Sequence, residues 1–265
     1  MWKLSFITKE QLTEHVRTTI TKYGDKLEAY DLSKFNSNII DPIKLIFDKT
    51  VYHLSWEEIV KNEIFRQRDK SNNNDIGYFH QNIFEYLPGC IVPEIGWDVI
   101  YKNKAGINIE GEKVQTLYIE MKNKHNTMNS ASAAKTYIKM QDQLLSDDNC
   151  ACFLVEIIAK KSQNILWKTS VDQRKVQHKR IRKISIDQFY SLVTGIDDAY
   201  YQLCLSLPEI IEKVVNDSKV LSTPYDKAFE ELEKLSTKLP LTDKNKAMIL
   251  AVYLLGFSDY IGFKN

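Results

Sequence analysis

The chain has 265 residues, of which 43% are hydrophobic and 27% charged, a composition typical of globular proteins and not of disordered ones. Its 36 Lys and Arg residues balance 35 Asp and Glu residues, so the net charge indicates no class of partner. No apolar stretch approaches the ~18 residues of a membrane span, and the N-terminus lacks the apolar segment of a signal peptide. We therefore expect no membrane association and a cytoplasmic location.

The basic residues are distributed unevenly. Between Lys160 and Lys183 there are nine Lys or Arg residues and a single acid, Asp172. Such a stretch can neutralise nucleic-acid phosphates, although a solvated loop or helix face has the same composition. The four Cys residues show neither C-x-x-C spacing nor pairing with His, so the sequence does not indicate a zinc site.

The first third of the chain is predicted to be helical. Apolar residues recur at helical spacing over 12–20, and again after Ser55, a candidate N-terminal cap. The polar run 69–75 interrupts this pattern and is expected to form a loop or turn. A further helix is expected over 77–87.

The middle of the chain changes to strands. Residues 98–101 form one candidate strand, which leads to an expected turn at 103–106, and residues 116–122 alternate as a second strand. Residues 130–145 are expected to form a helix. The nearly continuous apolar run 152–158 predicts a strand buried on both faces. This order of elements predicts an α/β core with a mixed sheet.

The remainder of the chain is predicted to be helical again. Helices are expected over 184–193 and throughout the chain beyond Pro208. The run at 240–243, Pro-Leu-Thr-Asp, is expected to separate the last two helices.

Three charged residues of the strand region are candidates for catalysis. Asp98 heads the first strand, and Glu120 and Lys122 lie two apart on the second, so both point away from the apolar face. The segment 99–119 is long enough for a hairpin that brings the two acids together. Phosphodiester hydrolysis needs charge neutralisation and an activated water, and Mg²⁺ bound by carboxylates beside a Lys suits both needs. The alternative is a same-face ion pair on an exposed strand.

Asp98 followed by Glu120-x-Lys122 on the next strand resembles the PD-(D/E)XK nuclease superfamily. Longer segments are similar to one branch, the type II restriction endonucleases that recognise GGNCC and related sites such as GGWCC. The similarity spans roughly residues 4–195. Its matching segments are 38–44, 69–81, 118–129 and 153–164.

The resemblance implies an α/β PD-(D/E)XK core with N- and C-terminal helical additions. It also implies Mg²⁺-dependent cleavage of double-stranded DNA that leaves 5′-phosphate ends, with Mn²⁺ able to substitute. Asp98 and Glu120 would bind the metal, with the backbone carbonyl of Met121 as a third ligand, and Lys122 would orient or help deprotonate the attacking water. The usual Pro before Asp98 is absent, which leaves Glu94, after Pro93, as a rival ligand.

Further residues are candidates for the site. A helical acid, Glu63 or Glu85, would complete the metal site, and the sequence does not choose between them. His80 and Gln81 would reach the active site or a phosphate, although a helical His is more often structural.

Three polar segments are expected to contact DNA. Their residues are Asn72 and Asn73; Lys124, His125, Asn126 and Asn129; and Arg174, Lys175, His178, Lys179, Arg180 and Arg182. The first segment is alternatively a tight turn, and the second a loop that caps the next helix.

No domain boundary is visible in the sequence, so we expect all of 1–265 to form one endonuclease domain. Its approximate parts are a helical N-terminal part at 1–75, a catalytic α/β core at 76–160, and a basic DNA-recognition segment with C-terminal helices at 161–265. A nearly palindromic target predicts a homodimer with one active site per strand. A separate methyltransferase would be a genetic partner. The alternatives are a structure-specific PD-(D/E)XK repair nuclease and a sequence-specific DNA-binding protein without catalysis.

Overall fold

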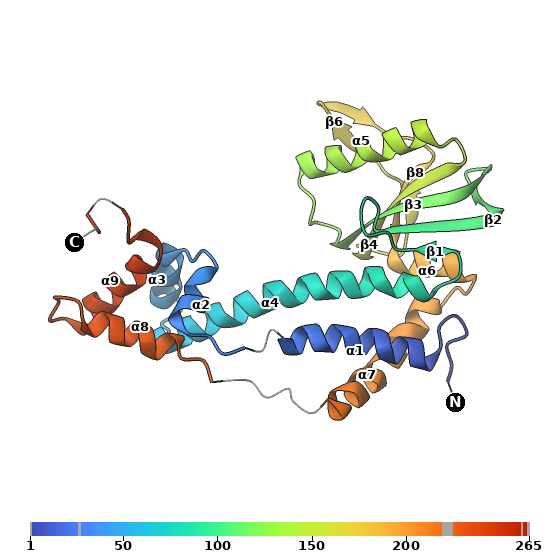
Figure 1. Ribbon diagram of the computed structural model, residues 1–265. Helices are drawn as coiled ribbons and strands as arrows, with labels where there is room; N and C mark the ends of the chain where they lie inside the picture. The colour runs from blue at the N-terminus through green and yellow to red at the C-terminus, as the bar shows by residue number, and fades with distance from the viewer. Residues whose placement is uncertain (1, 26–27, 219–224, 261, 264–265) are drawn as a thin grey trace. The chain divides into compact units, whose positions relative to one another are not determined.

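The computed structural model describes residues 2–25, 28–218, 225–260 and 262–263 (Figure 1). The chain divides into two compact units, one of residues 1–20 and 75–219 and the other of residues 21–74 and 220–265. Each unit has its own hydrophobic core. Among the described helices, none is both long enough and apolar enough to cross a membrane.

A mixed sheet forms the centre of the first unit. Within the described residues its strand order is β1-β2-β3-β4-β8-β5. β3 pairs in parallel with β4, and β4 with β8, whereas the other neighbours are antiparallel. This confirms the predicted α/β core with a mixed sheet. The strands are β1 (Cys90–Ile91), β2 (Val99–Ile109), β3 (Glu112–Lys124), β4 (Cys150–Ile158), β5 (Asn164–Leu166) and β8 (Ile181–Ser185).

β3 and β4 lie in the middle of this sheet. β3 alternates apolar and polar side chains, and β4 is apolar along nearly its whole length. Leu117 and Ile119 of β3 are fully buried on one face, as their alternation predicts. β4 is buried from Cys150 to Ile157, as predicted for a strand covered on both faces. Its side chains alternate between two cores, since Phe153 belongs to the main core and Leu154 to the smaller one.

Helices cover both faces of the sheet (Figure 1). The smaller core lies under α5 and the β6–β7 hairpin, and the main core joins the other face to α6, α1, α7 and the end of α4. The elements are α1 (Lys9–Asp25), α4 (Trp56–Asn82), the 3₁₀ helix η1 (Ile83–Tyr86), α5 (Ser130–Ser146), β6 (Thr169–Val171), β7 (Arg174–Val176), α6 (Ile186–Thr194) and α7 (Ala199–Asp217).

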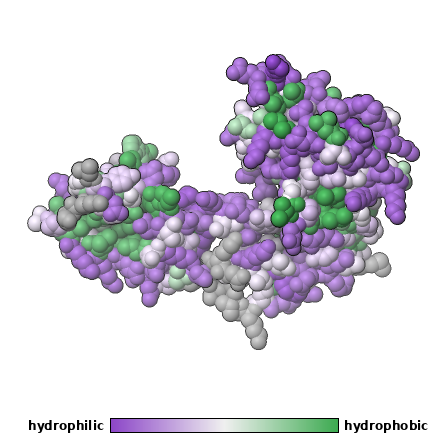
Figure 2. All heavy atoms as spheres, turned by 45° about the horizontal axis from the view of Figure 1, so that its top comes forward, coloured by the Kyte–Doolittle hydropathy of each residue, from purple (hydrophilic) through white to green (hydrophobic). Residues whose placement is uncertain are grey.

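The second unit is helical. It consists of the remaining helices with the greater part of α4: α2 (Leu32–Ser37), α3 (Pro42–Val51), α8 (Ala228–Thr237) and α9 (Lys244–Phe257). Its core includes Phe35 from the N-terminal part of the chain and Leu232 from the C-terminal part. Some hydrophobic residues reach its surface on the face shown in Figure 2. On α3, Ile43, Phe47 and Val51 are exposed.

The polar run 69–75 is helical, so the predicted loop is wrong. It lies inside α4, which begins after Ser55 as predicted. The side chain of Asn73 donates to Asp69, one turn earlier, at 2.9 Å. Polar side chains therefore bond to one another along the helix surface and leave the backbone helical. Asn72 and Asn73 accordingly lie on a helix and not in a tight turn.

The turn predicted at 103–106 is also absent. β2 continues to Ile109, and its register with β3 shifts between Lys102 and Ile107, which marks a bulge. The chain reverses at Glu110 and Gly111, whose φ values of 52° and 85° fit a tight hairpin turn. Gly111 adopts its positive φ without steric cost. Glu110, by contrast, is a non-Gly residue that the turn holds at positive φ.

The region after β4 contains strands that the sequence pattern does not predict. The helix expected over 184–193 begins only at Ile186, because the preceding residues form β8. Pro208 lies inside α7, so this helix begins earlier than predicted, at Ala199, and α8 and α9 follow it as expected. The break at 240–243 separates α8 from α9, as predicted.

Arg182, predicted to contact DNA, is buried on β8, next to the edge strand β5. Its guanidinium donates to the side chain of Asn164 at 2.6 Å and to the carbonyl of Asn164 at 2.8 Å. It also pairs with Glu110 at 2.6 Å. Arg182 thus ties the short strand β5 and the β2–β3 turn to β8.

We expect Arg182→Met to lower the free energy of unfolding by about 1–3 kcal/mol, because the carbonyl and carboxylate it satisfies lose their donor. Arg174→Met is the matched control, since Arg174 is exposed, and its effect should stay within about 0.5 kcal/mol. Urea unfolding followed by circular dichroism measures both. Equal stability of the two variants would contradict the structural role of Arg182.

Candidate active site

Asp98 and Glu120 face each other across β2 and β3. Val99 pairs with Ile119 in the antiparallel register, and the backbone N–H of Asp98 donates to the Ile119 carbonyl at 3.0 Å. Asp98 therefore lies opposite Glu120, and opposite residues of an antiparallel pair project to the same face. The β2–β3 hairpin thus brings the two acids to one face, as the length of the segment 99–119 predicts.

Lys122 lies on the same face of β3 as Glu120. Its ammonium donates to Oε1 of Glu120 at 2.8 Å. The alternate residues Leu117, Ile119 and Met121 contribute to the main core on the opposite face. The polar face carrying Glu120 and Lys122 is thus the one that the alternation of the strand predicts.

A second lysine, Lys139 of α5, completes this cluster. Its ammonium donates to Oε2 of Glu120 at 2.9 Å and to the carbonyl of Gly96 at 2.6 Å. It also lies 4.1 Å from the centre of the Trp97 ring. Sequence reasoning missed Lys139, because no local pattern of an Ala-rich helix distinguishes it from Lys135 one turn earlier.

The pKa values of the two acids are shifted in opposite directions. Burial raises the pKa of Asp98, and the nearby charge of Glu120 adds to this, although the Met121 N–H, at 2.6 Å, partly offsets it. Burial alone would also raise the pKa of Glu120, but hydrogen bonds from Lys122 and Lys139 outweigh burial and the pKa lies below its ordinary value. Glu120 is therefore firmly ionised, whereas Asp98 is protonated more easily.

The donor set fits a divalent cation. Two carboxylates converge on one face, and carboxylate oxygens are the protein ligands that Mg²⁺ and similar hard cations prefer. A cation between Asp98 and Glu120 would also relieve the repulsion that raises the pKa of Asp98.

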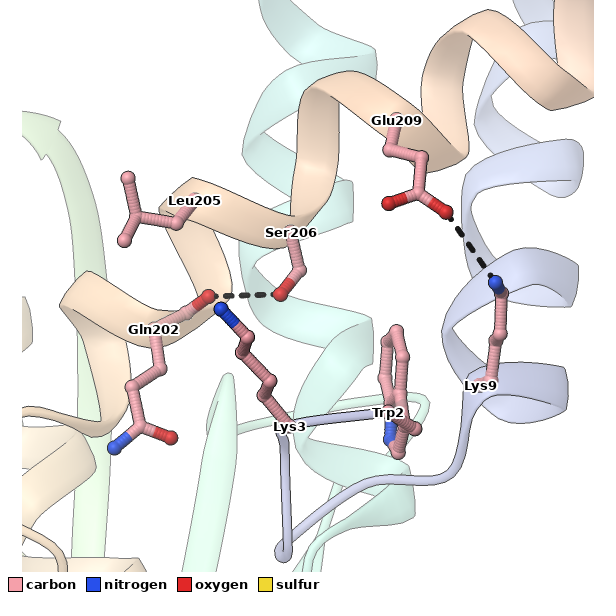
Figure 3. A pocket seen from close by; sticks show the side chains of 7 residues that line it. All are labelled: Trp2, Lys3, Lys9, Gln202, Leu205, Ser206 and Glu209. Carbon is pink, nitrogen blue, oxygen red and sulfur yellow. Dashed lines mark hydrogen bonds and ion pairs between the residues drawn. The ribbon is translucent and has the colours of Figure 1, made fainter.

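A hollow elsewhere in the first unit lacks such a pair. It lies between the N-terminal segment, α1 and α7 (Figure 3). Its acid, Glu209, is already paired with Lys9 at 3.3 Å. The residues that line it are Trp2, Lys3, Lys9, Gln202, Leu205, Ser206 and Glu209. Opposed carboxylates, which a divalent cation prefers as ligands, lie just before β2 and on β3 instead.

Comparison with known proteins identifies the family of this chain. The Eco47II restriction endonuclease family matches residues 4–216. The type II restriction enzyme Sau96I of Staphylococcus aureus is 34% identical over 213 residues, which cover 77% of this chain and 78% of the relative. The type II restriction enzyme Eco47II of Escherichia coli is 31% identical over 225 residues, or 81% of this chain and 89% of the relative.

The chain belongs to the Eco47II restriction endonuclease family. It is therefore a type II restriction endonuclease, a site-specific deoxyribonuclease, as the resemblance of its strand motif to restriction enzymes implies. The matched region contains the whole of the first unit's sheet, including Asp98, Glu120 and Lys122.

A third acid does not join Asp98 and Glu120 in the described part of the chain, where no group of three or more His, Cys, Asp or Glu side chains could hold a metal ion. Glu63 belongs to the second unit, and its carboxylate is bonded to Arg66. Glu85 is exposed on η1, and Glu94 is exposed before β2. A metal at the acidic pair would thus complete its shell with a backbone carbonyl, water and phosphate oxygens.

His80 is neutral in the endonuclease at neutral pH. Burial lowers its pKa to about 4, and the neighbouring His15 contributes to the same shift. Its ring packs edge-on against Phe79, with ring centres 5.5 Å apart. His80 and the half-buried Gln81 lie at the end of α4. A neutral imidazole there offers hydrogen bonds but no positive charge for a phosphate.

The loop after β3 presents polar residues to solvent. Lys124, His125 and Asn126 are exposed. Asn129 caps α5, because its side chain accepts the backbone N–H of Ser132 at 2.8 Å. Asn129 therefore caps the helix, which was the alternative to DNA contact for this segment. The exposed residues before it remain candidates for DNA contact.

The basic stretch separates into two groups. Arg174 and Lys175 are exposed on β7, next to the tight turn of the β6–β7 hairpin. Lys179 is paired with Glu112, and Arg180 donates to the carbonyl of Cys150 at 3.2 Å. The second group thus has partners within the protein, whereas the side chains of the first extend into solvent.

His178 lies between these two groups. Burial lowers its pKa, and the charges of Arg180 and Lys179 act in the same direction. Its ring nitrogen Nδ1 accepts the backbone N–H of Arg180 at 3.2 Å. The His178 ring thereby helps to shape the chain before β8 and is less easily charged than an ordinary His.

We expect Asp98→Asn to raise the stability of the metal-free protein at neutral pH. The raised pKa means that ionised Asp98 is less favourable in the folded than in the unfolded chain, so its charge destabilises the fold. Asn is neutral and still accepts the Met121 N–H. The gain should disappear as the pH falls through the raised pKa towards the ordinary value of 3.8.

Thermal unfolding in the presence of a chelator, at several pH values, measures this difference. Asp142→Asn is the control, because Asp142 is an exposed residue of α5 and its replacement should have little effect at any of these pH values. If Asp98→Asn unfolded at a lower temperature than the wild type at every pH, the ionised carboxyl would not destabilise the folded protein.

Proposed function

We propose that this restriction endonuclease hydrolyses double-stranded DNA at GGNCC or GGWCC with a PD-(D/E)XK active site composed of Asp98, Glu120 and Lys122. The observation that carries this proposal is the pairing of Asp98 opposite Glu120, with Lys122 bonded to Glu120 on the same face. The family supports site-specific cleavage. The target sequence rests on the resemblance to enzymes that cut GGNCC-type sites.

Asp98 and Glu120 would hold the divalent cation, Mg²⁺ with Mn²⁺ able to replace it, and the Met121 carbonyl would be a further ligand. A bound cation supplies charge neutralisation and Lewis acidity at the scissile phosphate. Lys122 orients the attacking water with its ammonium and stabilises negative charge as the new bond forms. The water oxygen bonds to phosphorus and loses a proton to solvent, the bond to the 3′ oxygen breaks, and that oxygen takes up a proton from solvent. The products are a 5′-phosphate and a 3′-hydroxyl.

The target symmetry extends the proposal to partners. GG and CC half-sites are related by a two-fold axis, so we propose a homodimer in which each copy cuts one strand. Both compact units, over 1–265, would act as one endonuclease domain in each copy. A methyltransferase encoded separately would protect the host DNA, and a cytoplasmic location follows from that task.

We expect Glu120→Gln and Lys122→Met each to lower the rate of plasmid cleavage about 100-fold or more, because each removes a group that acts in the reaction itself. Unmethylated plasmid DNA of known sequence, digested with Mg²⁺, should give discrete fragments with the wild type. Lys113→Met is a control on the same strand, since Lys113 is exposed near the start of β3.

The fragments also test the specificity. Ends that map to GG-N-CC sites would support the proposed target, and their central bases would distinguish GGNCC from GGWCC. Discrete ends elsewhere would reject the target and keep the mechanism. Cleavage that survives in both variants would reject the assigned residues.

Arg174 and Lys175 are proposed to contact DNA phosphates from the β6–β7 hairpin. We expect Arg174→Met and Lys175→Met each to weaken duplex binding, measured with Ca²⁺ in place of Mg²⁺. Each should also reduce the slope of log affinity against log salt by about 0.9, the value for one phosphate contact. Lys213→Met, an exposed lysine of α7, is the control. Unchanged salt slopes in both hairpin variants would show that the hairpin does not contact the backbone.

A further inference from the structure

Lys139 occupies the oxygen of Glu120 that Lys122 leaves open. Lys122 donates to Oε1 at 2.8 Å, and Lys139 donates to Oε2 at 2.9 Å. Both carboxylate oxygens of this proposed metal ligand therefore hold an ammonium group. With Asp98 opposite, two negative and two positive side chains balance one another in the metal-free protein.

Several contacts besides Glu120 hold the ammonium of Lys139 in place. The carbonyl of Gly96 accepts its ammonium at 2.6 Å, and the Trp97 ring lies 4.1 Å below it. The Trp97 ring is itself fixed, since its Nε1 donates at 3.2 Å to Gln143, one turn further along α5. An exposed lysine usually forms a loose ion pair, whereas here three partners determine where the ammonium lies.

We propose that Lys139 competes with the divalent cation for Glu120. An oxygen that accepts an ammonium has one lone pair fewer to offer a metal ion, and a positive charge beside the site repels a second one. The cation binds Oε2 without this competition only when the ammonium leaves it, after which Gly96 and Trp97 still hold Lys139 beside the site. This inference rests on the proposed function, in which Asp98 and Glu120 bind the cation. Lys139 is in this sense a positioning residue that acts through Glu120.

Mn²⁺ binding to the full-length, DNA-free protein tests this role without any measurement of cleavage. The free ion is followed by electron paramagnetic resonance during titration. We expect Lys139→Met and Lys139→Gln to lower the Kd for Mn²⁺ about tenfold, because a unit charge close to the site is removed. Lys139→Arg, which keeps the charge, should bind more weakly than either.

Lys135→Met is the matched control, because Lys135 is an exposed lysine one helical turn away. Its Kd should change by less than about twofold if contact with Glu120, and not net charge, determines the effect. Lys139→Gln keeps a donor for the Gly96 carbonyl, so it remains a test if the Met variant does not fold, which circular dichroism would show.

The Glu120→Gln variant separates the two proposals. Loss of Mn²⁺ binding in Glu120→Gln, with unchanged or weaker binding in both neutral Lys139 variants, would overturn the role of Lys139 and leave the proposed metal site standing. Undiminished binding in Glu120→Gln would reject the metal site itself. Tighter binding in the neutral Lys139 variants, together with its loss in Glu120→Gln, is the expected result.

Discussion

The antiparallel register between β2 and β3 is the constraint on which the proposed active site depends. A slip of one residue would turn Glu120 and Lys122 towards the main core and bring apolar side chains to the polar face. Two features oppose that slip. Leu117 and Ile119 are fully buried on the other face, and the tight turn at Glu110–Gly111 sets the pairing at one end. The acidic pair is therefore positioned by apolar residues that take no part in the chemistry.

The same arrangement places charge where a protein core disfavours it. The carboxyl of Asp98 is half-buried, and its raised pKa reflects the free energy that this position costs the fold. Glu120 avoids a similar cost because two ammonium groups bond to it. The site is thus tolerable without a metal, yet retains one carboxyl that an added cation would stabilise. Asp98 is thus the carboxyl that a cation would stabilise, whereas Lys122 and Lys139 stabilise Glu120.

The sequence pattern predicts the middle strands of the sheet better than its edge strands. The alternation of β3 and the continuous apolar run of β4 follow from burial, so Glu120 and Lys122 could be placed on one face in advance. The predicted loop at 69–75 is wrong because these polar residues, most of them exposed or half-buried, belong to a long helix, which propensity alone does not show. Strands of three residues, such as β5, are too short to have a period. Lys139 meets Glu120 only through tertiary packing, which no spacing within one element encodes.

The order of the two units along the chain has a consequence for synthesis on the ribosome. The core of the second unit joins Phe35, made early, to Leu232 and Val252, made near the end. The sheet with its acidic pair is complete at β8, before those last helices emerge. A chain interrupted after β8 would therefore present unpaired apolar helix faces from its early part, a feature that cellular chaperones and proteases act on. Incomplete copies of a DNA-cutting enzyme would in this way be marked for removal.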